Sequence, residues 1–575
     1  MRVNSWEGLS KMALTEAELS AFGVDFNFEV PEEDDSPAIK PRALVPIYTC
    51  DVETDPFQFG RYPEPFCCDL FDGSTHTTYW GDDCIEKMCA YIVTLPPGFI
   101  YFHNGGRFDI YYFMKLVRGN PALIINGRVV RTFCKSRDGN HPHEIRDSYA
   151  IMPFALAKYK KDDIDYMLME RETREENRAD IIKYLKGDTT YLHELCVAFL
   201  QMFGNKLTIG SAAMKELQKH HQFESLSKLC DSEIRADYYY GGRVECFEKG
   251  TLAGPWNVYD VNSMYPYVMK AYEHPVSMPN ASTNKIRKST CFVKVRGVNN
   301  GAFPTRTKQG LRFDLTRGVF TVSIHEFNVA LEHGLFQPEK ILECINFGQC
   351  SNFAGFVDSY YALREKAKVE GDAMHGLFYK FVLNSAYGKF AQNTDKYMEY
   401  CITEGDTNLT TDGWTPYETD DVTRTRSYII WKRKPQLGGN EGRHQRTYNV
   451  ATGASITGAS RAVLMNAIAK AERPIYCDTD SIICKSLDGV TLHDKNLGAW
   501  KHEATSETAC IGGKKLYALF DAAGECNKQA NKGVNLTPQE IREVCQGEVI
   551  TSARIAPSFH LDGSYNFITR KVRMT

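Results

Sequence analysis

Two short carboxylate motifs place the strongest constraint on how this chain folds, because apolar residues typical of β-strands flank each of them. Asp51-Val52-Glu53 ends one such run, and Asp478-Thr479-Asp480 stands between Ile475 and Ile482-Ile483. Side chains alternate between the two faces of a strand, so Asp51 and Glu53 share one face. The second motif is predicted at the tip of a hairpin, where neighbouring carboxylates repel each other unless a cation offsets their charge. We therefore expect two carboxylate clusters suited to divalent metals.

The composition is that of a multidomain globular protein. A chain of 575 residues is too long for one hydrophobic core, so several domains are expected. No run approaches the ~18 apolar residues of a membrane span. The N-terminus, MRVNSWEGLSKM, lacks the apolar core of a signal peptide, so secretion is not indicated.

The cysteine pattern indicates the redox environment of the protein, and the net charge limits how it can bind nucleic acid. The 18 cysteines are scattered without any CxxC pair, which indicates reduced thiols in a cytosolic environment. The net charge of −4 argues against binding nucleic acid through bulk positive charge. It leaves open an enzyme with locally basic grooves whose acidic residues hold metals.

Local patterns divide the chain into segments. The acidic, proline-containing stretch VPEEDDSPAIKP (30–41) predicts a poorly ordered extension over residues 1–45. Helical periodicity is found around 176–203 and 359–390. The polar, Gly/Thr/Asp-rich stretch over 391–450 is typical of turns and short hairpins.

Further residues join the first carboxylate pair in a fixed order. Asp109 follows an aromatic residue and Asn104 at close spacing, and Tyr184 and Asp188 are four apart on one helix face. Each piece alone is common on protein surfaces. The ordered set resembles the three exonuclease motifs of DnaQ-like 3′→5′ exonucleases in family B DNA polymerases.

That resemblance assigns roles around the first cluster. Asp51, Glu53, Asp109 and Asp188 would hold two metals, one carrying the water that attacks the terminal phosphodiester. Tyr184 would orient this water, and Lys161 would support catalysis. The predicted ligands of the single-stranded primer end are His103, Asn104, Phe108, which packs on a base, Ser148 and Phe154.

A second set of motifs surrounds Asp478 and Asp480. Asp260, at the end of a predicted strand, begins Asp260-Val-Asn-Ser-Met-Tyr-Pro266, which resembles motif A of family B polymerases (DxxSLYP, here with Met264). The Asp-Thr-Asp hairpin resembles motif C. Lys380, Asn384 and Tyr387 form one helical stripe of a cation, an amide and a phenol, which suits a surface facing a nucleoside triphosphate and resembles motif B.

A helical hairpin is expected around motif B. Lys368 precedes Gly371 and Asp372, which predict the end of one helix and the N-cap of the next. Lys368 and Lys380 would then grip the triphosphate from the two arms of the hairpin.

Three shorter elements complete the family order, which spans roughly 50–520. Tyr239-Tyr-Gly241-Gly242 resembles the YxGG element between exonuclease and polymerase, and Lys515-Leu-Tyr517 resembles the KxY element that contacts the primer strand. Thr457-Gly-Ala-Ser-Arg461 resembles the Tx2GR primer-template element, with Ser460 departing from the usual Gly or Ala. Leu497-Gly-Ala-Trp500 and His502-Glu503 also fit.

The resemblance implies a two-metal polymerase site. Asp260 and Asp480 would be the principal metal ligands, and Val261 is placed in the same metal site. Asp478 would lie close to the metals with a less direct role. Tyr265 would lie under the sugar, and Tyr387 would pack on the nascent base pair. Lys368, Lys380 and Asn384 would face the phosphates, and Ser263 of motif A is placed among the DNA contacts. Two Mg²⁺ ions per site are expected, with Mn²⁺ as an alternative.

Two insertions indicate the subgroup. One lies between motif A and Lys368, and the other lies between Lys389 and Thr457. Both positions match protein-primed polymerases of linear-genome phages and linear plasmids, the phi-twenty-nine type. The implied partners are template and primer DNA, dNTPs, a terminal protein as primer and a single-strand-binding protein. The implied setting is the cytoplasm of a bacterial host, with no membrane partner.

The predicted architecture is a multidomain α/β protein with an RNase H-like (DnaQ-like) 3′→5′ exonuclease domain and a right-hand polymerase. The expected parts are an N-terminal extension (1–45), the exonuclease domain (46–207), palm (208–271), an insertion contacting terminal protein and DNA (272–355), fingers (356–391), a second insertion for processivity and strand displacement (392–449), palm (450–530) and thumb (531–575).

Alternative functions remain open at this level. The chain could be a family B polymerase that uses a nucleic-acid primer or no primer. An exonuclease-only nucleic-acid-binding protein is a different class, and the intact Asp260, Asp480 and Lys380 argue against it. Zinc binding at His141/His143 or His220/His221 has no supporting cysteine spacing.

Overall fold

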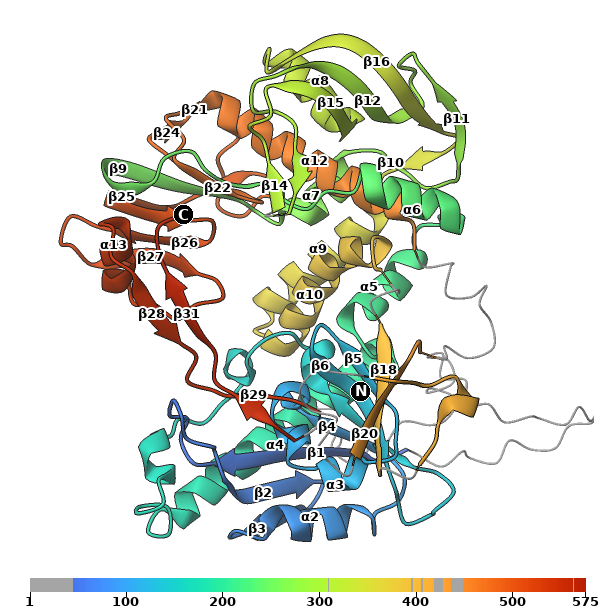
Figure 1. Cartoon of the computed structure of the whole chain (residues 1–575), viewed down its shortest axis with the longest axis vertical. Helices are drawn as coiled ribbons and strands as arrows, with labels where there is room; N and C mark the ends of the chain where they lie inside the picture. Colours follow the sequence, from blue (N-terminus) through green and yellow to red (C-terminus); the bar gives the residue numbers. More distant parts are fainter. Residues whose placement is uncertain are drawn as a thin grey trace, which may run out of the picture.

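The computed structural model describes residues 45–308, 310–393, 397–404, 407–417, 428–435, 448–561 and 563–575. The predicted N-terminal extension lies outside these ranges, apart from Val45. Two large sheets dominate the fold, the first at the bottom of the view and the second above it on the left, with a helical hairpin between them (Figure 1).

The first large sheet has parallel strands at its centre, flanked by antiparallel ones. The central strands are β1 (Ile47–Thr54), β4 (Phe99–Phe102) and β7 (His143–Asp147). The flanking strands are β2 (Pro65–Phe71), β3 (His76–Trp80), β5 (Ala122–Ile125) and β6 (Arg128–Cys134). One face packs on α2 (Cys84–Ile92) and the other on α4 (Arg178–Phe203). Thr49 Oγ1 donates to the Thr189 carbonyl at 2.8 Å, which fixes α4 against β1.

A hairpin from the predicted second insertion extends this sheet. β18 (Met398–Glu404) pairs with β20 (Tyr428–Arg433) and, on its other side, with β5, so that Met398 lies opposite Ile124. The short β19 (Thr415–Pro416) pairs with β20 and ends the ten-stranded order β19-β20-β18-β5-β6-β7-β4-β1-β2-β3. The hairpin predicted for the polar stretch is confirmed in its described part. Its attachment to a sheet that is distant in sequence was not predicted.

The second large sheet carries the other carboxylate motif. Its seven strands are β8 (Val244–Cys246), β9 (Gly250–Val261), β22 (Tyr476–Asp478), β23 (Ser481–Cys484), β25 (Trp500–Gly513), β26 (Leu516–Phe520) and β27 (Cys526–Asn531), in the order β27-β26-β25-β9-β23-β22-β8. Two helices lie next to it, α7 (Met264–Ala271) and α12 (Val450–Lys470). α12 is buried along most of its length, because Gly, Ala, Ser and Thr allow neighbouring backbones to approach from several sides.

The first insertion forms its own layer against α12. A four-stranded sheet consists of β11 (Pro279–Thr283), β16 (Phe336–Phe347), β12 (Thr290–Asn299) and β15 (Arg317–Ser323), in that order. The helix α8 (Ile324–Glu332) packs between this sheet and α12, over a core that includes Phe303, Phe320 and Phe336.

The helical hairpin between the large sheets is α9 (Ala354–Val369) and α10 (Ala373–Phe390). Gly371 takes the left-handed conformation (φ 72°), and the Asp372 carboxylate accepts the backbone N–H of His375. The predicted helix end and N-cap are thus confirmed. α5 (Ile209–Gln218) packs on α10, and α6 (Lys228–Asp237) packs on α12.

Short elements complete the described part of the chain. They are α3 (Met114–Val117), β10 (His274–Pro275) with β17 (Cys350–Ser351), β13 (Thr305–Thr307) with β14 (Gly310–Arg312), and β21 (Ala471–Glu472) with β24 (Ser486–Leu487). None of the helices in the described ranges has the length and apolar character needed to cross a membrane.

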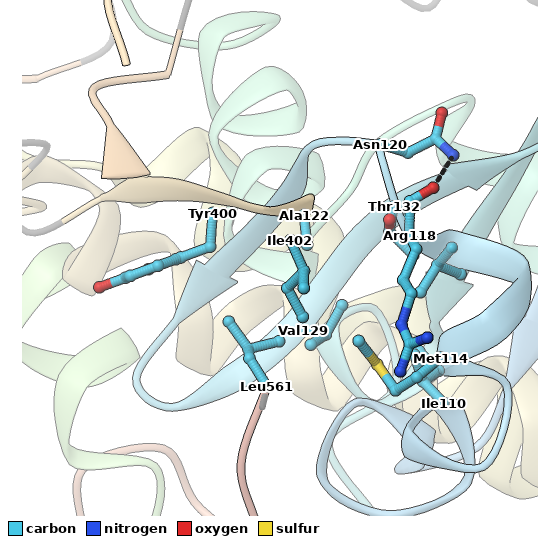
Figure 2. A pocket seen from close by; sticks show the side chains of 11 residues that line it. Ile110, Met114, Arg118, Asn120, Ala122, Val129, Thr132, Tyr400, Ile402 and Leu561 are labelled. Atoms are coloured by element: carbon cyan, nitrogen blue, oxygen red, sulfur yellow. Dashed lines mark hydrogen bonds between the residues drawn. The ribbon is translucent and has the colours of Figure 1, made fainter. Parts of the chain in front are cut away.

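The C-terminal segment reaches from the second sheet back to the first. After α13 (Pro538–Cys545) come β28 (Ile550–Ala553) and its partner β31 (Thr569–Val572), and between them β29 (Ser558–Phe559) pairs with β30 (Tyr565–Asn566) (Figure 1). We call residues 554–561 and 563–568 the thumb arm. Figure 2 shows Leu561 of this arm beside Val129 and Ile402, where it helps to enclose a cavity of about 20 Å³.

We predict that Phe559→Ala loosens the thumb arm. The Phe559 ring stacks on Tyr111 at 5.7 Å and meets Tyr112 edge-on at 5.7 Å. Because Phe559 is partly buried, removing its ring should cost on the order of 1 kcal/mol of the free energy that holds the arm in place. The fraction of molecules with a detached arm should then rise about fivefold. Limited proteolysis should show correspondingly faster cleavage within the arm. Leu492→Ala, at an exposed apolar residue outside the arm, is the control, and equal cleavage rates in the two variants would contradict the prediction.

Candidate active sites

The first carboxylate cluster forms where three elements meet. Asp51 and Glu53 lie on β1, Asp109 opens a 3₁₀ helix shortly after β4, and Asp188 lies on α4. Tyr184 is one turn before Asp188, and its hydroxyl is 3.0 Å from the hydroxyl of Tyr166. The structure therefore brings together all the carboxylates predicted for this cluster.

The electrostatics of this cluster are unfavourable for four ionised carboxylates. Burial, followed by the charges of Asp109 and Glu53, raises the pKa of Asp51 well above its ordinary value. Burial and Asp188 raise the pKa of Glu53 to about 8, and burial raises that of Asp109 to about 7. Lys161 Nζ is 3.5 Å from Asp188 Oδ2 and offsets part of this charge. A bound cation would offset the negative charge that remains on the carboxylates.

The donor chemistry of this cluster fits a divalent metal. Carboxylate oxygens are hard ligands, and the buried Asp188 Oδ1 has no hydrogen-bond partner. Within the described ranges, no group of three or more His, Cys, Asp or Glu side chains already has a metal-binding arrangement.

The residues predicted to bind the single-stranded primer end around this cluster differ in accessibility. The two ring nitrogens of His103 lie 2.9 Å from Ser148 Oγ and 2.9 Å from the Phe154 carbonyl, so the imidazole is held inside the wall of the site. Asn104 has a left-handed backbone (φ 61°) that turns the chain after β4. Phe108 meets Phe57 edge-on at 5.1 Å.

Ser148 and Phe154 lie below the surface. Ser148 is fully buried, and Phe154 is 3% exposed and stacks on Phe381 of α10 at 5.3 Å. The predicted direct contact of these two side chains with a DNA strand does not fit this arrangement, because other protein groups already surround them. Sequence spacing alone carried no information on their burial.

The second carboxylate cluster is built on adjacent strands of the other large sheet. Asp260 near the end of β9 is in register with Ser481 on β23, and the Val261 amide donates to the Asp480 carbonyl at 2.8 Å. Asp480 lies in the turn between β22 and β23, where Thr479 has φ 58°. The predicted hairpin with carboxylates at its tip is confirmed.

Burial dominates the acidity of the second cluster as well. Burial and the charge of Asp480 raise the pKa of Asp260 to about 7, and burial raises that of Asp480 to about 6. Glu503 on β25 contributes to both increases. The sequence assigns no role to Glu503, because nothing in the sequence alone places β25 beside β9.

Asp478 is engaged by neighbouring groups. Its carboxylate is bonded to Lys515 Nζ, and it accepts from Thr479 Oγ1 at 3.0 Å. The Lys515 amide donates to the Tyr476 hydroxyl at 3.0 Å, and Tyr517 packs on the Tyr476 ring at 5.0 Å. These contacts are consistent with a less direct role for Asp478 than for Asp260 and Asp480.

The YxGG element packs directly on this hairpin. A Cβ at Gly242 would lie 2.6 Å from Thr479 Oγ1, so only glycine allows this approach. The Thr479 amide donates to the Arg243 carbonyl at 2.7 Å. Arg306 of the first insertion donates to the Tyr239 carbonyl at 2.7 Å.

The side chains of Thr457 and Arg461 in the Tx2GR element are buried. The side chain of Arg461 forms two bonds to Glu326, at 2.7 and 2.9 Å, and donates to the carbonyls of Tyr240 and Gly241 at 2.7 Å each. Thr457 Oγ1 donates to the Ala454 carbonyl at 3.1 Å. Both side chains are 2% exposed, so their predicted direct contacts with DNA do not fit this arrangement. Arg461 instead joins the YxGG element to the first insertion.

The candidate nucleotide-binding residues line the space between α7 and α10. The rings of Tyr265 and Tyr387 stack at 3.7 Å with an interplanar angle of 10°. Ser263, at the N-terminal end of α7, has φ 54°. Asn384 lies on the same stripe of α10 as Tyr387. The Tyr265 and Tyr387 rings therefore each cover one face of the other.

Basic residues lie around Lys380, which is nearer the N-terminal end of α10 than Tyr387. Partial burial, followed by Arg364, Lys158 and Lys368, lowers the pKa of Lys380. Lys368 is also bonded to Glu365. Arg364 is one turn before Lys368 on α9, so helical spacing could have identified it. Lys158 comes from the first large sheet's domain, and no sequence signal connected it with Lys380.

The fold and these sites define an enzyme class. An RNase H-like sheet with one carboxylate cluster is joined to a right-hand palm with a second cluster and to a helical hairpin rich in cations. This combination defines polymerases that carry an attached exonuclease.

The comparisons with known proteins agree. Residues 156–483 match the family model for DNA polymerase type B, organellar and viral. The chain is 42% identical over 560 residues to the DNA-directed DNA polymerase of Enterobacteria phage PRD1, covering 92% of this chain and 98% of the relative. It is 27% identical over 423 residues to the DNA polymerase of Bacillus phage phi29, covering 65% and 66%, respectively.

A solved structure shows the same fold. Phi29 DNA polymerase in a ternary complex with primer-template DNA and incoming nucleotide substrates matches with a TM-score of 0.68 at 19% sequence identity, covering 92% of this chain and 100% of that one. The chain belongs to the organellar and viral type B DNA polymerases and is a DNA-directed DNA polymerase of the protein-primed group. The predicted family and fold class are confirmed.

We predict that Glu53→Gln stabilises the metal-free protein in a pH-dependent way. The pKa of Glu53 is raised to about 8 from its ordinary value of 4.5, because burial penalises ionisation in the folded state. Wild-type stability should therefore fall relative to the variant as the pH rises from about 4.5 to 8. Because Glu53 keeps part of its surface exposed, the expected difference is about 1–2 kcal/mol above pH 8.

Thermal unfolding in EDTA across this pH range measures the effect. Glu543→Gln, on the surface helix α13, is the control and should give no such trend. A difference that is already complete at pH 4 would contradict the electrostatic explanation.

Proposed function

We propose that this polymerase synthesises DNA at the Asp260/Asp480 cluster and proofreads at the Asp51/Glu53/Asp109/Asp188 cluster, starting from a terminal protein. The observation that supports this most strongly is the presence of two clusters of buried, mutually repelling carboxylates on separate sheets. A bound cation would offset the repulsion in each cluster, and each has its own neighbouring candidates for substrate binding.

At the synthesis site, Asp260 and Asp480 would hold two Mg²⁺ ions, with the Val261 backbone adjacent and Mn²⁺ as an alternative. When bound, such metals lower the pKa of an attacking hydroxyl and stabilise the leaving oxygen. Tyr265 would lie under the sugar and Tyr387 against the nascent base pair, once their stack opens. Lys380, Lys368 and Asn384 would neutralise charge on the phosphates.

At the editing site, Asp51, Glu53, Asp109 and Asp188 would hold the metals. The hydroxyl of Tyr184, positioned by Tyr166 at 3.0 Å, would orient the attacking water. Lys161, 3.5 Å from Asp188, would stabilise the developing negative charge. Asn104 and Phe108 would hold the frayed primer end, with the buried His103–Ser148 pair supporting this wall from behind.

We predict that the two clusters can be inactivated independently. Asp480→Ala should reduce primer extension at least about 1,000-fold and leave degradation of single-stranded DNA intact. Asp51→Ala combined with Glu53→Ala should do the reverse. Gel assays with a labelled primer measure both activities, and Asp488→Ala, at an exposed carboxylate, is the control. Residual strand degradation in the double variant would refute the editing assignment.

We also propose that a terminal protein primes synthesis. Similarity over nearly the full length of the phage PRD1 polymerase and the two insertions support it. The first insertion would contact the terminal protein and DNA, and the β18–β20 hairpin would contribute to processivity and strand displacement. Single-strand-binding protein would cover the displaced strand, and replication would take place in the cytoplasm of a bacterial host. For the domains, we propose the same limits as those predicted from the sequence.

We predict that the protein attaches a first nucleotide to a candidate terminal protein. Incubation with template, labelled dATP or another dNTP and that protein should transfer label covalently to a protein hydroxyl. Asp480→Ala should abolish the transfer, because the same metals serve both reactions. Normal primer extension without any protein labelling would favour the alternative of a nucleic-acid primer or no primer.

A further inference from the structure

One segment of the exonuclease domain, residues 154–161, contacts the fingers helix α10; we call it the connecting segment. At one end, the Phe154 ring stacks on Phe381 at 5.3 Å with an interplanar angle of 20°. Toward the other end, Asp372 at the start of α10 contributes, after burial and Glu194, to the raised pKa of Tyr159. The segment therefore contacts α10 at Phe381, and Tyr159 lies near enough to the start of α10 for the charge of Asp372 to act on it.

The connecting segment is fixed firmly on its exonuclease side. The Tyr159 hydroxyl and Lys160 Nζ both donate to Glu194 of α4, at 2.8 and 2.9 Å. Leu156 is buried, and Lys161 contacts Asp188 at 3.5 Å. The backbone around Lys158 is thus held in place, whereas the side chain of Lys158 is exposed.

Lys158 belongs to a group of cations whose charges act on Lys380. Phe154, four residues before Lys158, stacks on Phe381, which is next to Lys380 in the sequence. The group contains Arg364 and Lys368 on α9, Lys380 on α10 and Lys158 on the connecting segment. Within the ranges that the structure describes, Lys158, Arg364 and Lys380 form no ion pair with a carboxylate. Three of these four cations have no carboxylate partner, so their mutual repulsion would favour a bound polyanion.

The position of this group along α10 indicates which polyanion. Lys380 is seven residues before Tyr387 on the same helix stripe, a distance of about 10 Å along the axis. Tyr387 stacks on Tyr265, and the charge of Asp480 acts on both phenols. A nucleotide whose base and sugar replace the stacked rings would extend its phosphates toward Lys380.

We propose that Lys158 is a nucleotide-binding residue that the exonuclease domain supplies to the polymerase site, where it contacts the phosphates of the incoming deoxynucleoside triphosphate together with Arg364 and Lys380. The proposal rests on the proposed function of Lys380. It has a consequence for editing, because Lys158 is three residues from Lys161. Triphosphate binding would hold the connecting segment against the fingers, so dNTP concentration would influence both activities.

The test uses the full chain with Asp51→Ala and Glu53→Ala, so that degradation does not interfere. Primer extension at varied dNTP concentration should give a KM for dNTP about 3- to 10-fold higher in Lys158→Ala, with little change in kcat. Lys158→Arg should restore KM because it keeps the charge. Lys160→Ala is the matched control, since it removes a cation from the same segment but one that is paired with Glu194.

A second measurement uses the exonuclease-competent protein. Lys158→Ala should raise, by the same factor, the dNTP concentration at which primer degradation gives way to net synthesis. Degradation of single-stranded DNA without dNTP should be unchanged. An unchanged KM in Lys158→Ala, or an equal rise in Lys160→Ala, would overturn the proposal. Failure of the parent protein to extend a primer would instead refute the proposed function.

Discussion

The mutual repulsion of buried carboxylates is the constraint on which both active sites depend. Folding brings Asp51, Glu53, Asp109 and Asp188 together at one sheet, and Asp260 and Asp480 together at the other, and burial raises the pKa in each cluster. Such clusters are costly unless cations enter, so the surrounding sheets must supply the stability that holds them in place. Parallel pairing of β1 with β4 and the register of β9 with β23 provide that rigidity.

The first large sheet serves as a scaffold for parts that are distant in sequence. β18 adds to its edge beside β5, and the thumb arm packs Phe559 against Tyr111 and Tyr112. The connecting segment joins the same domain to the fingers through Phe154 and Phe381. The exonuclease domain therefore positions the second insertion, the thumb and the fingers through separate contacts. A change in its stability would affect synthesis as well as editing.

At the palm, one buried ion pair organises several motifs. Arg461 on α12 bonds to Glu326 of the first insertion and to the carbonyls of Tyr240 and Gly241. The YxGG element in turn touches the hairpin of Asp478 and Asp480 through the close approach of Gly242 and Thr479. Removing one member of such a pair leaves a buried charge without compensation, which typically costs about 3–5 kcal/mol. The insertion, the linker and the synthesis site are thus mechanically connected.

The sequence by itself determined the chemistry, the order of motifs and much of the local structure. Strand alternation placed Asp51 and Glu53, helical spacing placed Tyr184 with Asp188, and Gly371 with Asp372 marked the break between α9 and α10. These features depend on neighbours within a few residues, and they could be read from the sequence. Only the tertiary structure decided that Arg461, Thr457 and Phe154 are buried and that β18 joins the exonuclease sheet. It also decided that the charge of Glu503 acts on Asp260 and that the charge of Lys158 acts on Lys380. The physical reason is that burial and electrostatic environment arise from side chains hundreds of residues apart, which local periodicity does not encode.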